Sequence, residues 1–197
     1  DKATEQIKAI NDNNGLSQAE KDAAVAKVNE AKQAALDKID DATNAADVTT
    51  AGNNGATAVG KVNPVANDEA KKAIQDAFNA KKDALDKRTD LSDTEKEAAK
   101  AKAKKAADDA IAEIDKQPGI APTPAEATAA QQVVDGEKTK ATEAIAKVNP
   151  IAKQAALDKI DAALKAKEKE MEGRDDLTEE EKKEAKEQSK RIAETKK

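Results

Sequence analysis

Carboxylates are the only abundant side chains in this sequence that could act in catalysis or bind a metal ion. The 197 residues include 40 Asp and Glu but no His and no Cys. The commonest general bases, nucleophiles and zinc ligands are therefore missing. Acidic pairs such as Asp108-Asp109 and Asp175-Asp176 lie in charge-rich stretches, which usually form solvated helix faces. We expect no catalytic residue, no cofactor-binding residue and no enzymatic activity.

One acidic segment, Asp12-Asn13-Asn14-Gly15, resembles part of a calcium-binding loop. If Gly15 were the sixth residue of an EF-hand loop, Ile10 would be the first and Lys21 the twelfth, where carboxylates are required. The segment fits the end of a helix better, with Gly15 in a left-handed C-cap, and the same is expected of Gly173. We expect no metal-binding residue and no cofactor.

The overall charge gives no reason to expect an anionic partner. The chain carries 35 basic and 40 acidic residues, a net charge of −5, so neither nucleic acid nor an anionic membrane surface is indicated. The lysines of residues 100–105 lack interleaved aromatic residues. No apolar run approaches the roughly 20 residues needed to cross a bilayer. We expect no membrane insertion.

The composition favours slender helical bundles. Alanine supplies 45 residues, whereas Leu, Ile, Val and Phe together supply only 28. So few large apolar residues often indicate disorder. However, long stretches of Ala, Lys, Glu, Asp and Gln favour helix, and a core of Ala with occasional Leu, Ile or Val is thin. We therefore predict an all-α fold with no sheet.

Internal repetition is the strongest signal. Lys61-Val62-Asn63-Pro64 recurs 86 residues later as Lys147-Val148-Asn149-Pro150. The same offset relates Arg88 to Arg174 and Ile74 to Ile160, and an offset of 75 relates Leu16-Ser17 to Leu91-Ser92. One unit of about 75–86 residues therefore occurs twice, with partial copies at the ends. The predicted division is residues 1–30 as part of a preceding repeat and the start of a shared helix, 31–105 as the first complete repeat, and 106–197 as the second.

Capping signals set the predicted helix boundaries. Ser17, Ser92 and Thr178 each have Glu three residues later (Glu20, Glu95, Glu181), the spacing of a capping box, and Thr123 has Glu126. Asn63-Pro64 and Asn149-Pro150 are typical of an N-cap followed by proline in the first turn. The predicted helices cover residues 2–10, 17–43, 47–62, 64–88, 92–116, 124–148, 150–172 and 178–195.

Apolar spacing predicts how these helices pack. Leu157, Ile160, Leu164 and Met171 form a narrow heptad-like seam. Further seams are Ile74, Phe78 and Leu85; Val25, Val28, Leu36 and Ile39; Ala103, Ile111 and Ile114; and Ala127, Ala130, Val134, Ala141, Ile145 and Val148. Narrow seams and short connections predict antiparallel three-helix bundles. We expect the helix at residues 17–43 to pack on two bundles and join them end to end into an elongated rod. The alternative is separate bundles with a bend at each capped turn.

The repeats resemble a known family. Ala34-Ala35-Leu36-Asp37-Lys38-Ile39-Asp40, Ala42-Thr43-Asn44-Ala45-Ala46-Asp47-Val48 and Gly60-Lys61-Val62-Asn63-Pro64 are similar to the "domain of unknown function" family numbered fifteen-forty-two. The second copy departs at residues 117–123, where Pro118, Gly119 and Pro122 replace the first connection. The family occurs in tandem in cell-wall-anchored surface proteins of Gram-positive bacteria. The resemblance implies a fibrous adhesin or biofilm-associated stalk, extracellular and attached to the cell wall through regions outside this segment. It carries over no catalytic residue.

Two functions remain open from the sequence. A monomeric structural spacer, which projects a distal binding domain, agrees with the repetition and the mixed-charge surface. A helical module that binds a host plasma or extracellular-matrix protein is the alternative, by analogy with other three-helix surface modules. Binding hot spots favour Trp, Tyr and Arg, and the chain has no Trp or Tyr and only Arg88, Arg174 and Arg191. The spacer is therefore the preferred prediction.

Overall fold

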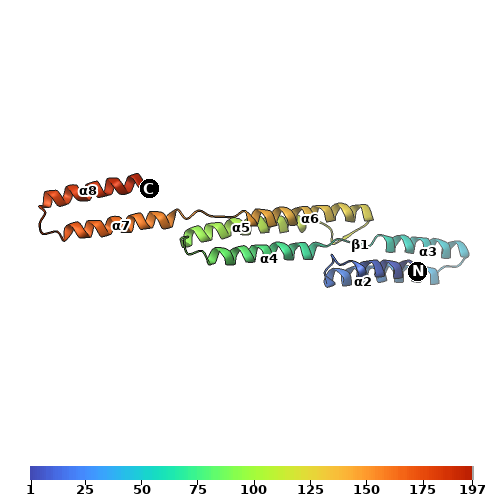
Figure 1. Cartoon of the computed structure of the whole chain (residues 1–197). Coiled ribbons are helices and arrows are strands. Elements are labelled where there is room, and N and C mark those ends of the chain that lie inside the picture. The colour runs from blue at the N-terminus through green and yellow to red at the C-terminus, as the bar shows by residue number, and fades with distance from the viewer. Residues whose placement is uncertain (197) are drawn as a thin grey trace. The chain divides into compact units, whose positions relative to one another are not determined.

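The computed structural model describes residues 1–196, and its labelled elements appear in Figure 1. Helices take up 78% of the chain, so the predicted all-α class is confirmed. The elements of the described residues are α1 (Lys2–Asp12), α2 (Gln18–Asp40), α3 (Ala45–Gly60), β1 (Asn63–Pro64), α4 (Asn67–Asp86), α5 (Asp93–Ile114), β2 (Ile120–Ala121), α6 (Pro124–Ala146), α7 (Gln154–Glu172) and α8 (Glu179–Lys196).

The chain divides into two compact units. Of the described residues, unit 1 comprises Asp1–Lys81 and Lys102–Lys147, and unit 2 comprises Lys82–Ala101 and residues 148–196. The helix α2 lies within unit 1, whereas α4 and α5 each contribute residues to both units.

Capping boxes begin three of the helices, as predicted. At α2, the backbone N–H of Glu20 donates to Ser17 Oγ at 3.2 Å and the backbone N–H of Ser17 donates to Glu20 Oε2 at 2.8 Å. Reciprocal pairs of the same kind begin α5 at Ser92 and Glu95 and α8 at Thr178 and Glu181. Each box satisfies backbone N–H groups that have no partner within the helix.

The two Asn-Pro sequences do not begin helices, and this prediction was wrong. Asn63 and Pro64 form β1, which pairs antiparallel with β2 in the register Asn63↔Ala121 and Pro64↔Ile120. The helix that follows starts only at Asn67, and the one after Pro150 starts only at Gln154. The prediction of no sheet was therefore also wrong, although each strand has only two residues. Proline is compatible with this strand because its missing N–H leaves no ladder donor unpaired.

The left-handed C-caps expected at Gly15 and Gly173 are absent from the described residues, where no residue has a positive φ. Gly173 does end α7, but with φ −80° and ψ 1°. At the end of α1, the backbone N–H of Gly15 donates to Asn13 Oδ1 at 2.9 Å. A local side-chain hydrogen bond therefore takes the place of a left-handed turn there.

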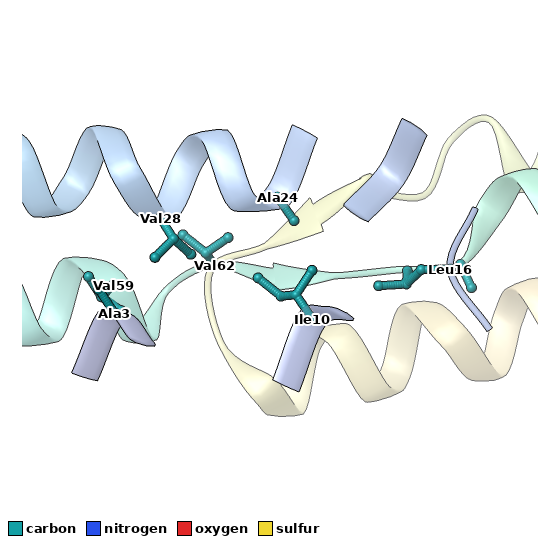
Figure 2. Close-up of a cluster of buried hydrophobic side chains, with 8 residues drawn as sticks. Ala3, Ile10, Leu16, Ala24, Val28, Val59 and Val62 are labelled. Carbon is teal, nitrogen blue, oxygen red and sulfur yellow. The ribbon is translucent and has the colours of Figure 1, made fainter. Parts of the chain in front are cut away.

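Within unit 1, α1, α2 and α3 all contact one another and form a three-helix bundle. Its core is a cluster of small and branched apolar side chains: Ala3, Ile10, Leu16, Ala24, Val28, Val59, Val62 and Ala66. Figure 2 shows Val28 and Ala24 of α2 facing Val62 and Ile10 across this core. Val59 near the end of α3 and Val62 just beyond it pack against the apolar residues of α1 and α2 and close the bundle.

The parts of α4, α5 and α6 in unit 1 bury further seam residues. Ile74 of α4 and Ile114 of α5 are fully buried. Val134 and Ile145 of α6 are at most 1% exposed. Lys71 of α4 pairs with Asp115 beyond the end of α5 at 2.6 Å. Of the seam predicted along α6 and just beyond its end, Ala127 is only half-buried, and the other five residues are buried: Ala130, Val134, Ala141, Ile145 and Val148.

Other predicted seam positions are less buried. Leu36 is 41% exposed, so its assignment to the core of α2 was wrong, and Val25 and Ile39 are half-buried. In unit 2, α7 and α8 contact each other. The α7 seam of Leu157, Ile160, Leu164 and Met171 lies only half-buried.

The search for membrane spans gave none: across the described residues, every helix is too short or too polar to cross a bilayer.

Candidate functional site

The most specific polar arrangement in unit 1 is centred on Glu20. Its Oε2 closes the capping box of α2, and its Oε1 accepts hydrogen bonds from the backbone N–H groups of Asn67 at 2.7 Å and Asp68 at 2.9 Å. These two N–H groups begin α4. Ser17 Oγ also donates to Asp68 Oδ2 at 2.9 Å. One carboxylate therefore caps two helices, and we call this arrangement a glutamate joint.

A second glutamate joint is centred on Glu95 in unit 2. Its Oε2 accepts from the backbone N–H of Ser92 at 2.9 Å, and its Oε1 accepts from those of Lys153 and Gln154, both at 2.7 Å. Lys153 and Gln154 lie at the start of α7. An offset of 75 residues relates the two glutamates. An offset of 86 relates the donors of the first joint to those of the second. The joint is therefore part of the repeat.

The joint is electrostatically favourable for an ionised carboxylate. The backbone N–H of Gln154, and then that of Ser92, lower the pKa of Glu95 from 4.5 to about 2. In α8, the backbone N–H of Thr178 and then its hydroxyl lower the pKa of Glu181. Backbone N–H groups at helix starts carry partial positive charge, so they stabilise the carboxylate over the neutral acid.

The turns beside the glutamates also recur. Arg88 forms a two-pronged pair with Asp90, with Nε to Oδ1 at 2.6 Å, and Arg174 forms the same pair with Asp176. The arginine hydrogen bonds lower the pKa of each aspartate to about 2. The structure places each arginine in the turn between two helices, paired with an aspartate two residues later.

A lysine bridge crosses each of the same two turns. Lys100 of α5 pairs with Asp86 at the end of α4, and Lys186 of α8 pairs with Glu172 at the end of α7 at 2.8 Å. The positions are related by the offset of 86. The hydrogen bond from Lys100 lowers the pKa of Asp86, and that from Lys186 lowers the pKa of Glu172. The cap, the arginine pair and the lysine bridge thus recur together at the α4–α5 and α7–α8 turns.

The acidic pairs considered from sequence do not converge into a site. Asp108 and Asp109 pair with Lys104 and Lys105 one helical turn earlier at 2.6 and 2.8 Å. Asp12 pairs with Lys8 in the same way. Among residues 1–196, no three His, Cys, Asp or Glu side chains are grouped so that they could hold a metal ion.

The surface hollows offer little for a small ligand. A shallow groove of about 740 Å³ between α5 and α6 is lined mainly by alanines with Asp109, Glu113, Glu137 and Lys140. Lys140 pairs with Glu137 on its own helix. Asp109 and Glu113 also pair with nearby lysines, Lys105 and Lys116.

The comparisons with known proteins address the part of the chain that holds the first joint. Residues 1–67 match the family model described as Domain of Unknown Function (DUF1542). This part of the chain is similar to the DUF1542 family. The family expected from the sequence is thereby confirmed for these residues. No curated protein and no solved structure matches the chain.

The DUF1542 match includes all of α1, α2, α3 and β1 and ends at Asn67. Ser17, Glu20 and the first of the two α4 residues whose N–H groups bind Glu20 therefore lie within it. Sequence reasoning identified the capping boxes but missed the second role of the glutamates. The donors are backbone N–H groups 47 to 59 residues away, and a backbone N–H leaves no mark on residue type. The recurrence of Glu at both positions was the available signal.

Proposed function

We propose that the chain is a non-enzymatic structural spacer, a set of stalk repeats from a bacterial cell-surface adhesin. Its task is to project a distal binding domain away from the cell wall. The DUF1542 match of residues 1–67 is compatible with a surface-protein repeat, and the rest of the proposal follows from what the repeats hold constant.

The observation that carries the proposal is the recurrence of the glutamate joint. Glu20 and Glu95 each connect the start of one helix to the start of another, whose N–H donors lie 47 to 59 residues further along the chain. A joint of this kind fixes the start of one helix against the start of the next helix but one, α2 with α4 and α5 with α7. A spacer requires specified joints and a specified core, whereas a solvated surface of any composition will serve.

The exposed positions support the same function. Outside the hairpin turns, exposed sites vary between the repeats among Lys, Glu, Asp, Gln and Ala, while caps and seam residues recur. Most of the ion pairs on the helix surfaces connect neighbours three or four residues apart on the same helix, such as Lys27 with Glu30 and Lys72 with Asp76. Such pairs solubilise a helix and add little stability. A module that grips a ligand requires a fixed exposed patch instead.

The experiment is a replacement in the surface protein that carries these repeats. Exchange of the repeats for an unrelated helical segment of equal length should preserve adhesion, and their deletion should impair it. Loss of adhesion after the length-matched exchange, or sub-micromolar binding of the isolated chain to a host plasma or matrix protein, would favour the binding module.

A further inference from the structure

Val65 and Ile151 occupy equivalent positions in the two repeats but differ in exposure. Val65 follows Asn63-Pro64 and Ile151 follows Asn149-Pro150, at the offset of 86. Val65 is 1% exposed, whereas Ile151 is 73% exposed and is the most exposed large apolar side chain of the described residues. A large apolar residue at a position that is buried in the other copy indicates a missing contact.

The cover over Val65 comes from the connection between α5 and α6. The backbone N–H of Val65 donates to Gly119 O at 3.0 Å, β1 pairs with β2, and the backbone N–H of Ala66 donates to Gln131 Oε1 at 2.9 Å. Gly119, β2 and Gln131 lie 54 to 65 residues beyond the segment that they cover. The residues in the same relation to Ile151 would be numbered beyond 197.

The hairpin of α7 and α8 lacks cover in the same way. An offset of 161 relates it to the α1–α2 hairpin. Ile10, Leu16, Ala24 and Val28 are 5% exposed or less and pack with Val59 and Val62 from the end of α3. Their counterparts are only half-buried: Met171, Leu177, Ala185 and Ser189.

Two polar anchors recur beside these seams. Gln6 Nε2 donates to Val62 O at 2.7 Å, and Lys81 Nζ, at the equivalent position, donates to Ala146 O at 2.8 Å. The first contact is made just beyond the end of α3 and the second at the end of α6. Lys167 of α7 is related to Lys81 by the offset of 86. On α8, Glu181 Oε2 closes the capping box, as Oε2 does in Glu20 and Glu95. Its Oε1 is therefore in the position from which Glu20 and Glu95 accept the N–H groups of a second helix start.

We propose that the exposed face of residues 149–152 and the α7–α8 hairpin is a docking site for one further repeat segment, of the type formed here by Gly119 to Gln154. The strand of that segment pairs beside Ile151, its helix covers Met171 and Leu177, and the start of its following helix binds Glu181. The occupant is defined by chemistry that the chain displays twice: a helix that ends in Val or Ile, two residues, then Val-Asn-Pro. This docking site does not depend on the spacer function, since a binding array would require the same joint.

The test adds the occupant to the chain. The offset of 86 aligns Lys197 with Ile111, so a copy of residues 112–160 joined after Lys197 continues α8 in register and supplies the connection, the helix and the next helix start. Amide hydrogen exchange is compared between the chain and its extended form. We expect exchange at Ile151 to slow at least tenfold, because its N–H acquires the bond that Val65 makes to Gly119, and we expect similar protection at Met171 and Ala185.

The matched control carries Asn at the three extension positions copied from Val134, Ile145 and Val148, and it should leave exchange at Ile151 and Met171 unchanged. A second control, Glu181→Gln in the extended chain, should speed exchange at the start of the added second helix and at Thr178, whose N–H also binds this carboxylate, and leave exchange at Ile151 protected. Unchanged exchange in the unmutated extension overturns the proposal, whether the added segment is helical or unstructured by far-UV circular dichroism. Protection of Ile151 that rises with the concentration of the unextended chain would also overturn it, since the occupant would then be a second copy.

Discussion

The backbone N–H of Gln154 donates to Oε1 of Glu95 at 2.7 Å, while Oε2 of the same carboxylate accepts from the backbone N–H of Ser92 at 2.9 Å. The start of a helix has N–H groups without partners and a partial positive charge. The carboxylate of Glu95 accepts hydrogen bonds from such N–H groups, and places a negative charge beside them, at the starts of two helices. The same arrangement at Glu20 makes this contact a property of the repeat.

Acid should weaken the Glu95 joint in a defined range of pH. The folded-state pKa of Glu95 is lowered from 4.5 to about 2 by the backbone N–H groups of Gln154 and Ser92. A lowered pKa contributes stability that is fully present above the unfolded value, near 4.5, and that is lost as the pH falls toward 2. We predict that Glu95→Gln flattens the pH dependence of stability between these values, measured by urea unfolding at each pH.

The control for this measurement is Glu97→Gln on the same helix, which removes an exposed carboxylate paired with Lys100. The comparison rests on the difference between the two variants. If the two variants gave the same pH profile, the lowered pKa of Glu95 would not be a feature of the folded protein.

Loss of the Glu20 carboxylate should destabilise unit 1 much more than loss of a neighbouring surface carboxylate. Glu20→Ala leaves the N–H groups of Ser17, Asn67 and Asp68 without their acceptor. We expect a loss of about 1–2 kcal/mol in the free energy of unfolding, the usual cost of a lost helix cap. Glu30→Ala removes only the exposed pair with Lys27 and should cost less than about 0.5 kcal/mol. Equal losses for the two variants would contradict the joint.

Two glycines of α3 should respond to alanine in opposite directions. A Cβ on Gly55 would lie 2.3 Å from the Cβ of Ala35 on α2, whereas a Cβ on Gly52 would meet nothing within 4 Å. Gly55→Ala should therefore lower the free energy of unfolding by about 1–3 kcal/mol through overpacking. Gly52→Ala should raise it by up to about 1 kcal/mol through helix propensity. Thermal unfolding of both variants, followed by circular dichroism, measures this difference; stabilisation by both would show that α2 and α3 are not in close contact.

Local signals in the sequence were sufficient to predict the helices. The Ser17–Glu20 and Ser92–Glu95 spacings identify true capping boxes, because both partners lie within one helical turn. Most predicted helix ends fall within about three residues of the observed ones. The packing of α1, α2 and α3 follows from their apolar seams in the same way, except that Leu36 is 41% exposed and Ala35 makes the close contact with Gly55 of α3.

The missed features all depend on residues far apart in the chain. Asn63-Pro64 has the local pattern of a helix start, but pairing with Ile120 and Ala121 holds it extended. The second role of Glu20 depends on backbone groups at Asn67 and Asp68, which the fold delivers and residue type does not reveal. Gly15 and Gly173 suggested left-handed caps because glycine allows them, yet the turns close with ordinary φ values. Long-range contacts of this kind override local preference.

The spacer function is tested most directly by separating surface from length. One, two or three tandem copies of the chain are placed between a bead and a reporter binding domain, and capture of the reporter's ligand is measured through a polymer layer that coats the bead. A matched series permutes the exposed Lys, Glu, Asp and Gln residues among themselves and leaves every cap, turn and seam residue in place. We predict that capture rises with copy number and is the same for the native and permuted series. Capture that is independent of copy number, or that is lost when the exposed residues are permuted, would contradict the spacer function.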